Sequence, residues 1–278
     1  MNSVAIVGLG LIGGSLALAL RARFPSLRLV ALDFSEVLGS PVLHELRMEA
    51  LPIADAQGRR AVFASVDLVV LAAPVSAIVQ LLPEAIEHAR VVTDCGSTKR
   101  SITACVEGLA ESARFVPGHP MAGLPDGGLV NARADLFVDR SWILCGDASA
   151  PDALARVEAM IAAVGAHAVH MPVVDHDRAV ALTSHVPQLL ASALAVLAAR
   201  GGAEPAAGPA FASATRVAGG SEAMWGGIFN TNADAIAEAL RALGAELEAV
   251  ARGLDQEPSD PRPALEILSQ ARKLRSPR

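Results

Sequence analysis

The sequence predicts an α/β fold, in which a Rossmann-type, doubly wound and mainly parallel sheet is followed by an all-α domain. Two observations lead to this prediction. Short apolar runs alternate with helical patterns over the first part of the chain, and several runs are uninterrupted, as in strands buried on both faces. Beyond residue 172 only helical patterns remain. We therefore expect two domains, residues 1–171 and residues 172–278.

Apolar runs predict the strands of the first domain. They span residues 4–7, 27–32, 67–72, 90–94, 114–116 and 142–145. Helical segments lie between them, which favours βαβ units and a parallel sheet. Residues 34–63 do not fit this pattern, because Pro41, Pro52 and Gly58 interrupt the periodicity.

Helical patterns in the second domain span residues 175–199, 206–218, 221–252 and 263–273. Glycine pairs at 201–202 and 219–220 separate the first three. Alanine supplies much of the apolar content, and aromatic residues make up only 3% of the chain. This composition favours closely packed helices over a β sandwich.

Composition and charge exclude several classes of protein. Hydrophobic residues make up 52% of the chain and mean hydropathy is +0.41, so we expect a folded core rather than disorder. The net charge is −6 and no long basic run occurs, which argues against a nucleic-acid partner but not against an anionic substrate. No uninterrupted apolar run reaches about 18 residues, and the first residues lack the features of a signal peptide, so we expect no membrane span or leader.

Cysteine and histidine spacing bears on metals and on location. The chain has three cysteines without CxxC spacing, which is typical of a reduced, cytoplasmic protein. Cys95 is expected to be a small packing residue, since no redox partner is evident. No cluster of histidine, cysteine and acidic residues has metal-ligand spacing, so we predict no metal site.

The segment GLGLIG at residues 8–13 fits the pattern G-x-G-x-x-G, and it connects a predicted strand to a predicted helix. The first glycine permits a tight turn, the second lets backbone approach a pyrophosphate, and the third lets helix and strand pack closely. Free N–H groups at the helix start then face the anion. The loop predicts a dinucleotide site that includes Gly8, Gly10, Leu11, Ile12 and Gly13.

Asp33 ends the second predicted strand, 20 residues after Gly13, where a carboxylate can accept hydrogen bonds from the adenine ribose. A carboxylate also repels a 2′-phosphate, and no arginine follows directly, so we predict NAD rather than NADP. The alternative is an ordinary turn-forming aspartate. Ala73 and Pro74 follow the third strand and are expected beside the cofactor.

Ligands of open α/β sheets bind beyond the carboxyl ends of the strands. His119 follows the fifth predicted strand in a loop of small residues, and the pKa of histidine suits a general base. A structural histidine is the alternative. Ser97 and Lys99 follow the fourth strand; Ser97 could cap a helix that begins near Arg100, and Lys99 could be a solvated surface charge.

Two positions of the helical domain also draw attention. His185 lies within an apolar helix, and Arg216 is the only cation between Arg200 and Arg241. Because an unpaired buried charge is costly, we expect Arg216 to bind a substrate carboxylate. An internal ion pair with Glu222 is the alternative.

Other residues invite simpler interpretations. Trp225 is expected in the core. The remaining histidines have no comparable setting; they are His44, His88, His167, His170 and His176.

Taken together, the motifs GLGLIGGS, LAAPV, DCGSTK, GHPMAG, SHVPQ and ATRVAGGSEAMWGGIFNTN occur in this order between about residues 3 and 240. This ordered set resembles the prephenate/arogenate (cyclohexadienyl) dehydrogenase family of tyrosine biosynthesis. The resemblance implies a Rossmann domain, a helical domain that forms a homodimer, and NAD as cofactor. It further implies oxidation of a ring alcohol with loss of CO2, giving 4-hydroxyphenylpyruvate from prephenate or tyrosine from arogenate.

The resemblance also implies roles for individual residues. It places the catalytic histidine at His119, its hydroxyl partner at Ser97, a substrate-binding histidine at His185 and the carboxylate-binding arginine at Arg216. It implies neither a mutase domain before residue 1 nor a regulatory domain after residue 278, so feedback control by tyrosine would act at the active site or the dimer interface.

The sequence departs from the family pattern in two segments. Glu222-Ala223 and Gly227 stand where the family often has Asp-Pro and Asp, and residues 34–63 do not follow the pattern. The substrate therefore stays open among prephenate, arogenate and an amino-substituted analogue.

The sequence argues against two other classes of protein. A β-hydroxyacid dehydrogenase would use a lysine of its helical domain, but residues 172–252 contain none. A non-catalytic NAD sensor would need no base, so His119 and Ser97 argue against it.

Overall fold

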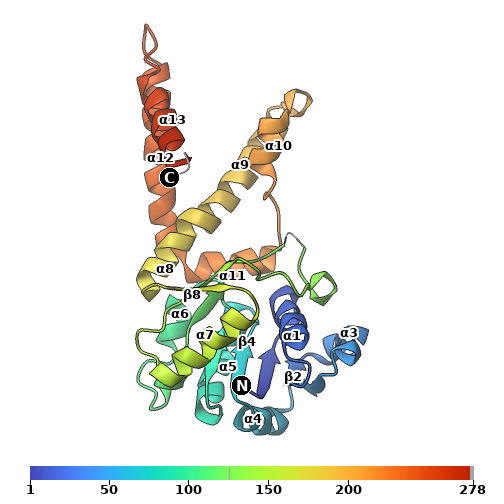
Figure 1. Cartoon of the computed structure of the whole chain (residues 1–278). Coiled ribbons are helices and arrows are strands. Elements are labelled where there is room, and N and C mark those ends of the chain that lie inside the picture. Colours follow the sequence, from blue (N-terminus) through green and yellow to red (C-terminus); the bar gives the residue numbers. More distant parts are fainter. Residues whose placement is uncertain (125, 276–278) are drawn as a thin grey trace.

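The computed structural model describes residues 1–124 and 126–275. A sheet domain is followed by a helical domain, which confirms the expected fold class. The helices α9 (Val186–Arg200) and α12 (Ala233–Leu254) project away from the sheet domain (Figure 1).

A parallel sheet with strand order β3-β2-β1-β4-β5-β6 forms the centre of the sheet domain. The order reverses direction between β1 and β4, which makes the sheet doubly wound and creates a switch point beyond their carboxyl ends. The strands are β1 (Ser3–Val7), β2 (Arg28–Asp33), β3 (Glu49–Pro52), β4 (Leu68–Leu71), β5 (Val92–Asp94) and β6 (Phe115–Val116).

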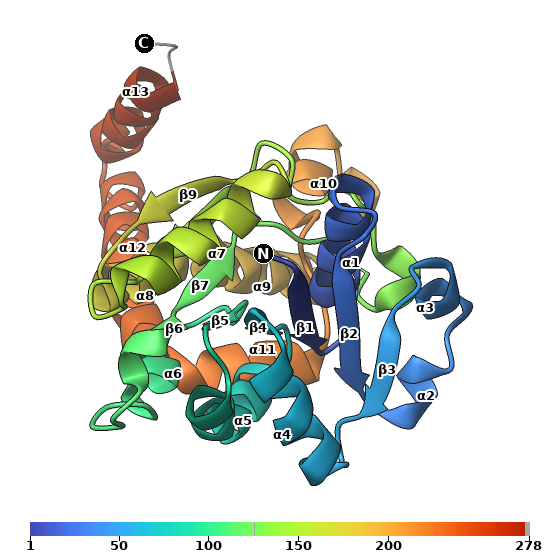
Figure 2. The same cartoon turned by 60° about the horizontal axis from the view of Figure 1, so that its bottom comes forward.

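Helices cover both faces of this sheet (Figure 2). Alternate residues of β1 enter different core clusters: Val4 and Ile6 face one side, Ala5 and Val7 the other. The first cluster includes α1 (Leu11–Arg23) and α7 (Pro151–Ala163), and the second includes α4 (Ala56–Ser65), α5 (Val75–His88) and α6 (Arg100–Ala104). Burial on both faces explains why the strand sequences are uninterrupted apolar runs.

The irregular segment 34–63 contains short elements rather than one helix. They are α2 (Ser35–Leu38), α3 (Pro41–Glu45), the edge strand β3 and most of α4. Pro41 starts α3 and Pro52 ends β3, which are positions where a missing N–H is tolerated. These short elements explain why the periodicity broke down there.

A second, smaller sheet lies beside the first. In it β7 (Gly118–Pro120) pairs antiparallel with β8 (Ser141–Leu144), which pairs parallel with β9 (His167–His170). The expectation of a loop around His119 was therefore wrong, because its backbone pairs with Ile143 in this sheet. Paired backbone holds this histidine more firmly than a loop would.

The helical domain begins after β9, and every element described beyond residue 172 is a helix or helical turn. The first is α8 (Val173–Val180), followed by one π-helical turn (Ala181–His185) and then α9. The others are α10 (Pro209–Thr215), α11 (Glu222–Thr231), α12 and α13 (Arg262–Arg275). The helix expected over 221–252 is thus two helices that meet at Asn232.

Short 3₁₀ turns complete the structure at Ser112–Arg114, Leu129–Asn131 and Glu204–Ala206.

The run Val173–Arg200 is long and apolar enough to cross a membrane by length and composition, and one third of its most apolar window is buried. The sequence predicted no membrane span, because charged and polar residues interrupt this run. His176 and Asp177, near its start, are fully buried. Farther along, Leu190, Leu194 and Leu197 are exposed.

Candidate active site

The glycines of residues 8–13 each meet a different steric demand. Gly8 has φ +91°, and a Cβ there would lie 2.6 Å from the Ala72 carbonyl oxygen. A Cβ on Gly13 would lie 1.9 Å from the Gly8 carbonyl oxygen. A Cβ on Gly10, in contrast, would meet no atom within 4 Å. The first and third glycines are therefore needed by the fold, and the second leaves open space above the backbone.

A pocket of about 460 Å³ opens over this loop. It is lined by Gly8, Gly10 and Asp33, by Ala73 and Pro74 after β4, and by Gly128 and Leu129. Since α1 begins at Leu11, the amide N–H groups of its first residues have no intrahelical acceptor. The open glycine backbone and these free amides fit the pyrophosphate of a dinucleotide.

Leu11 and Ile12 contribute backbone rather than side chains to this loop. The Leu11 side chain is buried in the core cluster of α1 and α7, and that of Ile12 packs against the same cluster.

Asp33 accepts hydrogen bonds from the amides of Leu9 (2.6 Å) and Phe34 (2.7 Å). It therefore stabilises its own turn, and a carboxylate has further lone pairs for a ribose. Glu36 also lines the pocket, and no lysine or arginine is among the described lining residues. This charge balance disfavours a 2′-phosphate.

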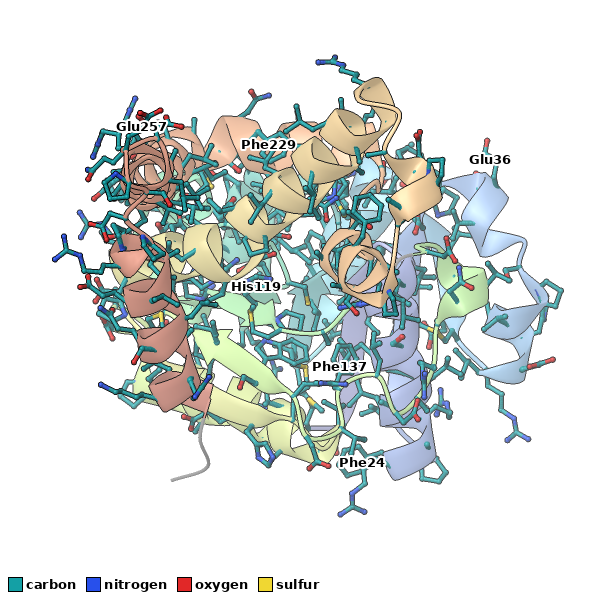
Figure 3. The ribbon with its side chains drawn as sticks, turned by 90° about the horizontal axis from the view of Figure 1, so that it is seen from above. Phe24, Glu36, His119, Phe137, Phe229 and Glu257 are labelled. Carbon is teal, nitrogen blue, oxygen red and sulfur yellow. The ribbon has the colours of Figure 1, made fainter. Side chains whose placement is uncertain are left out.

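His119 projects from β7 near the centre of the molecule, where strands of the sheet domain meet the helical domain (Figure 3). Its Nδ1 lies 2.8 Å from Nε2 of His176, whose Nδ1 lies 2.7 Å from Oδ1 of Asp177. His176 and Asp177 come from α8, so side chains of the two domains meet at this histidine.

Burial, and then the nearby Lys99 ammonium, hold the pKa of His119 well below its usual value. The imidazole is therefore neutral at pH 7, which is the form that accepts a proton.

The suggestion that Lys99 is a solvated surface charge was wrong. Its side chain is fully buried and forms an ion pair with Asp94, with 2.5 Å between Nζ and Oδ2. The other oxygen of Asp94 accepts from the amide of Gly118, directly before His119.

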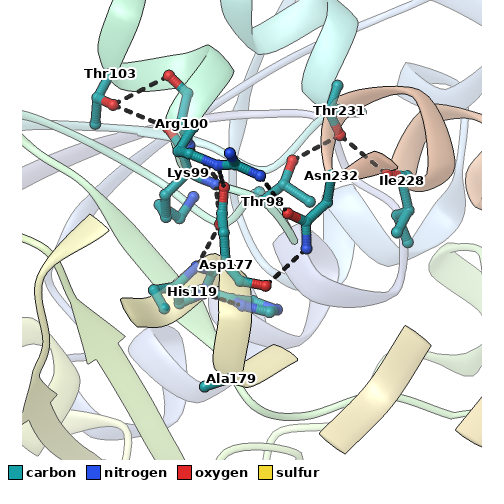
Figure 4. A network of polar contacts seen from close by, with 12 residues as sticks. Thr98, Lys99, Arg100, Thr103, His119, Asp177, Ala179, Ile228, Thr231 and Asn232 are labelled. Atoms are coloured by element: carbon teal, nitrogen blue, oxygen red, sulfur yellow. Dashed lines mark hydrogen bonds and ion pairs between the residues drawn. The ribbon is translucent and has the colours of Figure 1, made fainter. Parts of the chain in front are cut away.

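The suggestion that Ser97 caps a helix was also wrong. The amides of Lys99 (2.8 Å), which precedes α6, and of Arg100 (3.0 Å), which begins it, instead donate to the carboxylate of Asp177 (Figure 4). Ser97 is half-buried, and its hydroxyl has no hydrogen-bond partner within residues 1–124 and 126–275. It is therefore free to hold a ligand.

His185 is buried at the end of the π-helical turn. The amide nitrogen of Asn232 donates to its Nδ1 (3.3 Å) and also to the Asp177 carbonyl oxygen (2.7 Å). Burial lowers the pKa of His185 to about 4, although the Asp177 carboxylate opposes the shift. Trp225 packs edge-on against this ring, with 6.1 Å between centroids, so it lines the site as well as packing against the helical core.

Sequence reasoning missed His176, Asp177 and Asn232, and the statement that His176 has no special setting was wrong. One signal was present: an Asp-His-Asp run near the start of an apolar helix, at residues 175–177, is an unusual place for charge. Asn232 gave no comparable signal.

Arg216 is exposed at the end of α10, so the argument from a buried charge was wrong. No ion pair with Glu222 or any other described acid is present either. Instead it lines a second pocket of about 460 Å³ together with Arg133, Arg140 and the segment that follows His119, residues 121–124. Among the lining residues, three guanidinium groups face one carboxylate, that of Asp135. This pocket suits an anion.

All three cysteines are free, and burial raises the pKa of the Cys95 thiol, as befits a packing residue. Over the described ranges, no group of three or more metal-ligating side chains is present.

Comparison with known proteins agrees with this geometry. Residues 16–170 match the family model for the prephenate dehydrogenase nucleotide-binding domain, and residues 172–268 match the model for the prephenate dehydrogenase dimerization domain. The chain belongs to the prephenate dehydrogenase family. The recognised motifs had indicated the same family.

Individual members of the prephenate dehydrogenase family cover most of the chain. A cyclohexadienyl dehydrogenase from Zymomonas mobilis is 30% identical over 270 residues, which is 92% of this chain and 90% of that protein. A prephenate dehydrogenase from Bacillus subtilis is 29% identical over 274 residues, 93% of this chain and 72% of that protein.

A solved structure shares the fold. The prephenate dehydrogenase of A. aeolicus, in complex with hydroxyphenyl propionate and NAD+, superposes with a TM-score of 0.84 at 24% identity and covers 99% of both chains.

Proposed function

We propose that this protein catalyses the NAD-dependent oxidative decarboxylation of a cyclohexadienyl acid, prephenate or arogenate, in tyrosine biosynthesis. One observation carries the proposal: a neutral histidine, His119, lies beyond the parallel sheet in the same domain as a dinucleotide cleft. Family membership supports the substrate class.

The residues that line the cleft would hold NAD. The amides at the start of α1 and the open backbone at Gly10 would receive the pyrophosphate, and Asp33 would accept hydrogen bonds from the adenine ribose. Ala73 and Pro74 line the cleft beyond β4. The chemistry that NAD supplies there is acceptance of a hydride.

His119 takes the proton of the ring hydroxyl, and Ser97 holds that hydroxyl in line. As the alcohol carbon gives up its hydride to the cofactor and becomes a ketone, the ring carboxylate leaves as CO2. Its bonding electrons pass through the ring to the ketone oxygen, which takes up a proton to form the phenol. The ring becomes aromatic, which makes the reaction effectively irreversible. His185 shapes the same pocket from the helical domain.

Arg216 binds the carboxylate of the substrate side chain and contributes mainly positioning. Its pocket also contains Arg133 and Arg140, with Asp135 as the opposing charge. The side chain of prephenate ends in a keto acid, whereas that of arogenate ends in an amino acid, with an ammonium group in place of the keto oxygen. Because the pocket carries excess positive charge, we expect prephenate to be the better substrate.

The two domains divide these tasks, with residues 1–171 binding the cofactor and residues 172–278 completing the substrate site. The helical domain forms a homodimer, which covers the exposed leucines of α9 and accounts for the apolar run Val173–Arg200 without a membrane. Unpaired cysteines fit a cytoplasmic location.

The deciding experiment measures NADH or NADPH formation with prephenate and arogenate, each with NAD and NADP. We expect turnover with NAD, a much lower kcat/KM with NADP, and a preference for prephenate of roughly tenfold, which corresponds to about 1.4 kcal/mol. Arg216→Ala should raise the KM for prephenate more than it lowers kcat, while Arg241→Ala, on the exposed face of α12, should change neither.

Other outcomes would point elsewhere. Dinucleotide binding without turnover of either substrate would favour the non-catalytic sensor. An unchanged KM in Arg216→Ala would remove this residue from carboxylate binding.

A further inference from the structure

A continuous chain of hydrogen bonds runs from His119 into the helical domain. It passes from Nδ1 of His119 to Nε2 of His176, and from Nδ1 of His176 to Oδ1 of Asp177. His176 and Asp177 are fully buried, so water does not compete for these contacts. Neither residue takes part in the reaction steps proposed for His119 and Ser97.

The direction of each hydrogen bond follows from the end of the chain. Asp177 accepts from the amides of Lys99 and Arg100 and from the Arg100 guanidinium. Although burial opposes it, these donors and His176 hold the pKa of Asp177 below its usual value. An ionised carboxylate only accepts, so Nδ1 of His176 must donate to it.

A neutral imidazole has one donor nitrogen and one acceptor nitrogen. In the neutral form of His176 the proton is on Nδ1, and the lone pair at Nε2 accepts from Nδ1 of His119. The proton of His119 is then on Nδ1, and the lone pair on its Nε2 has no partner among the described residues. That nitrogen is the one available to a substrate hydroxyl.

We propose that His176 and Asp177 are positioning residues that hold His119 in the tautomer with a free Nε2, so that the helical domain makes the base of the sheet domain competent. The proposal rests on the proposed function, in which His119 is the base.

Asp177, which ends this chain of hydrogen bonds, also takes part in the contacts that dock the two domains. Arg100 forms an ion pair with Asp234 at 2.5 Å. It also donates to Asp177 and Asn232, and the Thr98 and Thr231 hydroxyls lie 2.8 Å apart (Figure 4). Loss of docking would therefore also release the tautomer of His119.

Asn232 holds His185 in the opposite tautomer to that of His119. Its side-chain oxygen accepts from Arg100, which identifies the other atom as the amide nitrogen. That nitrogen donates to Nδ1 of His185, so the proton of His185 is on Nε2. The site thus offers one acceptor, at His119, and one donor, at His185.

The test compares a substitution that removes the hydrogen-bonding groups of His176 with one that keeps a donor and an acceptor. In His176→Leu the acceptor for His119 is lost. We expect kcat to fall by roughly 10²-fold, which is within the range for misplaced general bases. The KM for the substrate and the KM for NAD should change little. In His176→Gln the amide oxygen can accept from His119, and kcat should recover in large part. His44→Leu, at an exposed histidine, is the control and should match the unaltered protein.

Nitrogen-15 NMR of the histidine side chains in the unaltered full-length protein reads the tautomer directly, with His119→Asn used to assign the signal. The groups that face His119 are Lys99, His176 and His185, with Asp94 and Asp177 behind them. We expect a protonated Nδ1 and a bare Nε2 from about pH 7 to pH 8.

Two results would overturn the proposal: an Nε2-protonated His119 in the unaltered protein, or unchanged kcat in His176→Leu. If His176→Leu fails to fold, the spectrum of the unaltered protein decides. Because that spectrum needs no substrate, its outcome is separate from a failure of the proposed reaction, which absent turnover of both substrates would reveal.

Discussion

The Asp94 carboxylate ties together three segments at the carboxyl edge of the sheet. Its oxygens accept from the amides of Gly96 (2.8 Å) and Gly118 (3.0 Å) and from the buried Lys99 ammonium. Because both charges of a buried ion pair lose their hydration, further hydrogen bonds are needed to offset the cost, and here the two amides supply them to the carboxylate. This arrangement fixes the loop that carries Ser97 relative to the strand that carries His119.

His119 should act as a base whose activity persists into acid. We expect His119→Asn to lower kcat by roughly 10²–10⁴-fold, since the proton acceptor is lost. In the unaltered enzyme the base is inactivated only when pH falls through its lowered pKa. A profile of kcat/KM against pH should therefore stay level from about pH 7 through the usual histidine pKa of about 6.5 and decline only below it.

Near-normal turnover in His119→Asn would remove this residue from the role of base. A decline of kcat/KM that begins above the usual histidine pKa would contradict the depressed value.

At the scale of elements, the glycines of residues 8–13 serve two different purposes: Gly13 is required by the fold, and Gly10 leaves room for the cofactor. Gly13→Ala places a methyl group against the Gly8 carbonyl and should destabilise the protein by about 1–3 kcal/mol, the usual range for overpacking. Gly10→Ala meets only open space, so stability should hardly change, whereas the KM for NAD should rise because the methyl group occupies the approach of the pyrophosphate.

Thermal unfolding without cofactor and the KM for NAD distinguish the two effects. Equal losses of stability in both variants would mean that Gly10 is required by the fold rather than by the ligand.

At the scale of the whole molecule, the projecting helices expose apolar side chains that a monomer would leave in water. Leu190, Leu194 and Leu197 lie on one face of α9, at spacings of four and three residues, and Leu197 is 64% exposed. Large exposed apolar faces mark interfaces, and the dimerization-domain match covers this segment.

We expect the double variant Leu194→Asp with Leu197→Asp to shift the protein from dimer to monomer, because two buried charges per subunit would oppose association. Sedimentation velocity measures the change. The matched control is Leu109→Asp, at an exposed leucine of the sheet domain, which should stay dimeric. A monomeric unaltered protein would contradict the proposed homodimer.

The sequence alone determined the fold class and the first elements of the site. Uninterrupted runs such as residues 68–71 reveal strands buried on both faces, because burial on both sides leaves no position for a polar residue. The glycine loop and the Asp33 that follows it identify a dinucleotide cleft for a similar reason: their spacing is set by local backbone geometry. Motif order added the family and drew attention to His119.

Tertiary structure alone decided which groups meet His119 and which side chains are buried. His176 contacts it from 57 residues away, and Lys99 meets Asp177 across 78 residues. No local pattern encodes such pairs, since they depend on how the two domains dock. The same docking buries Lys99 and leaves Arg216 exposed, the reverse of what the sequence suggested. Local spacing thus specifies the cofactor cleft, whereas contacts between the domains specify the surroundings of the base.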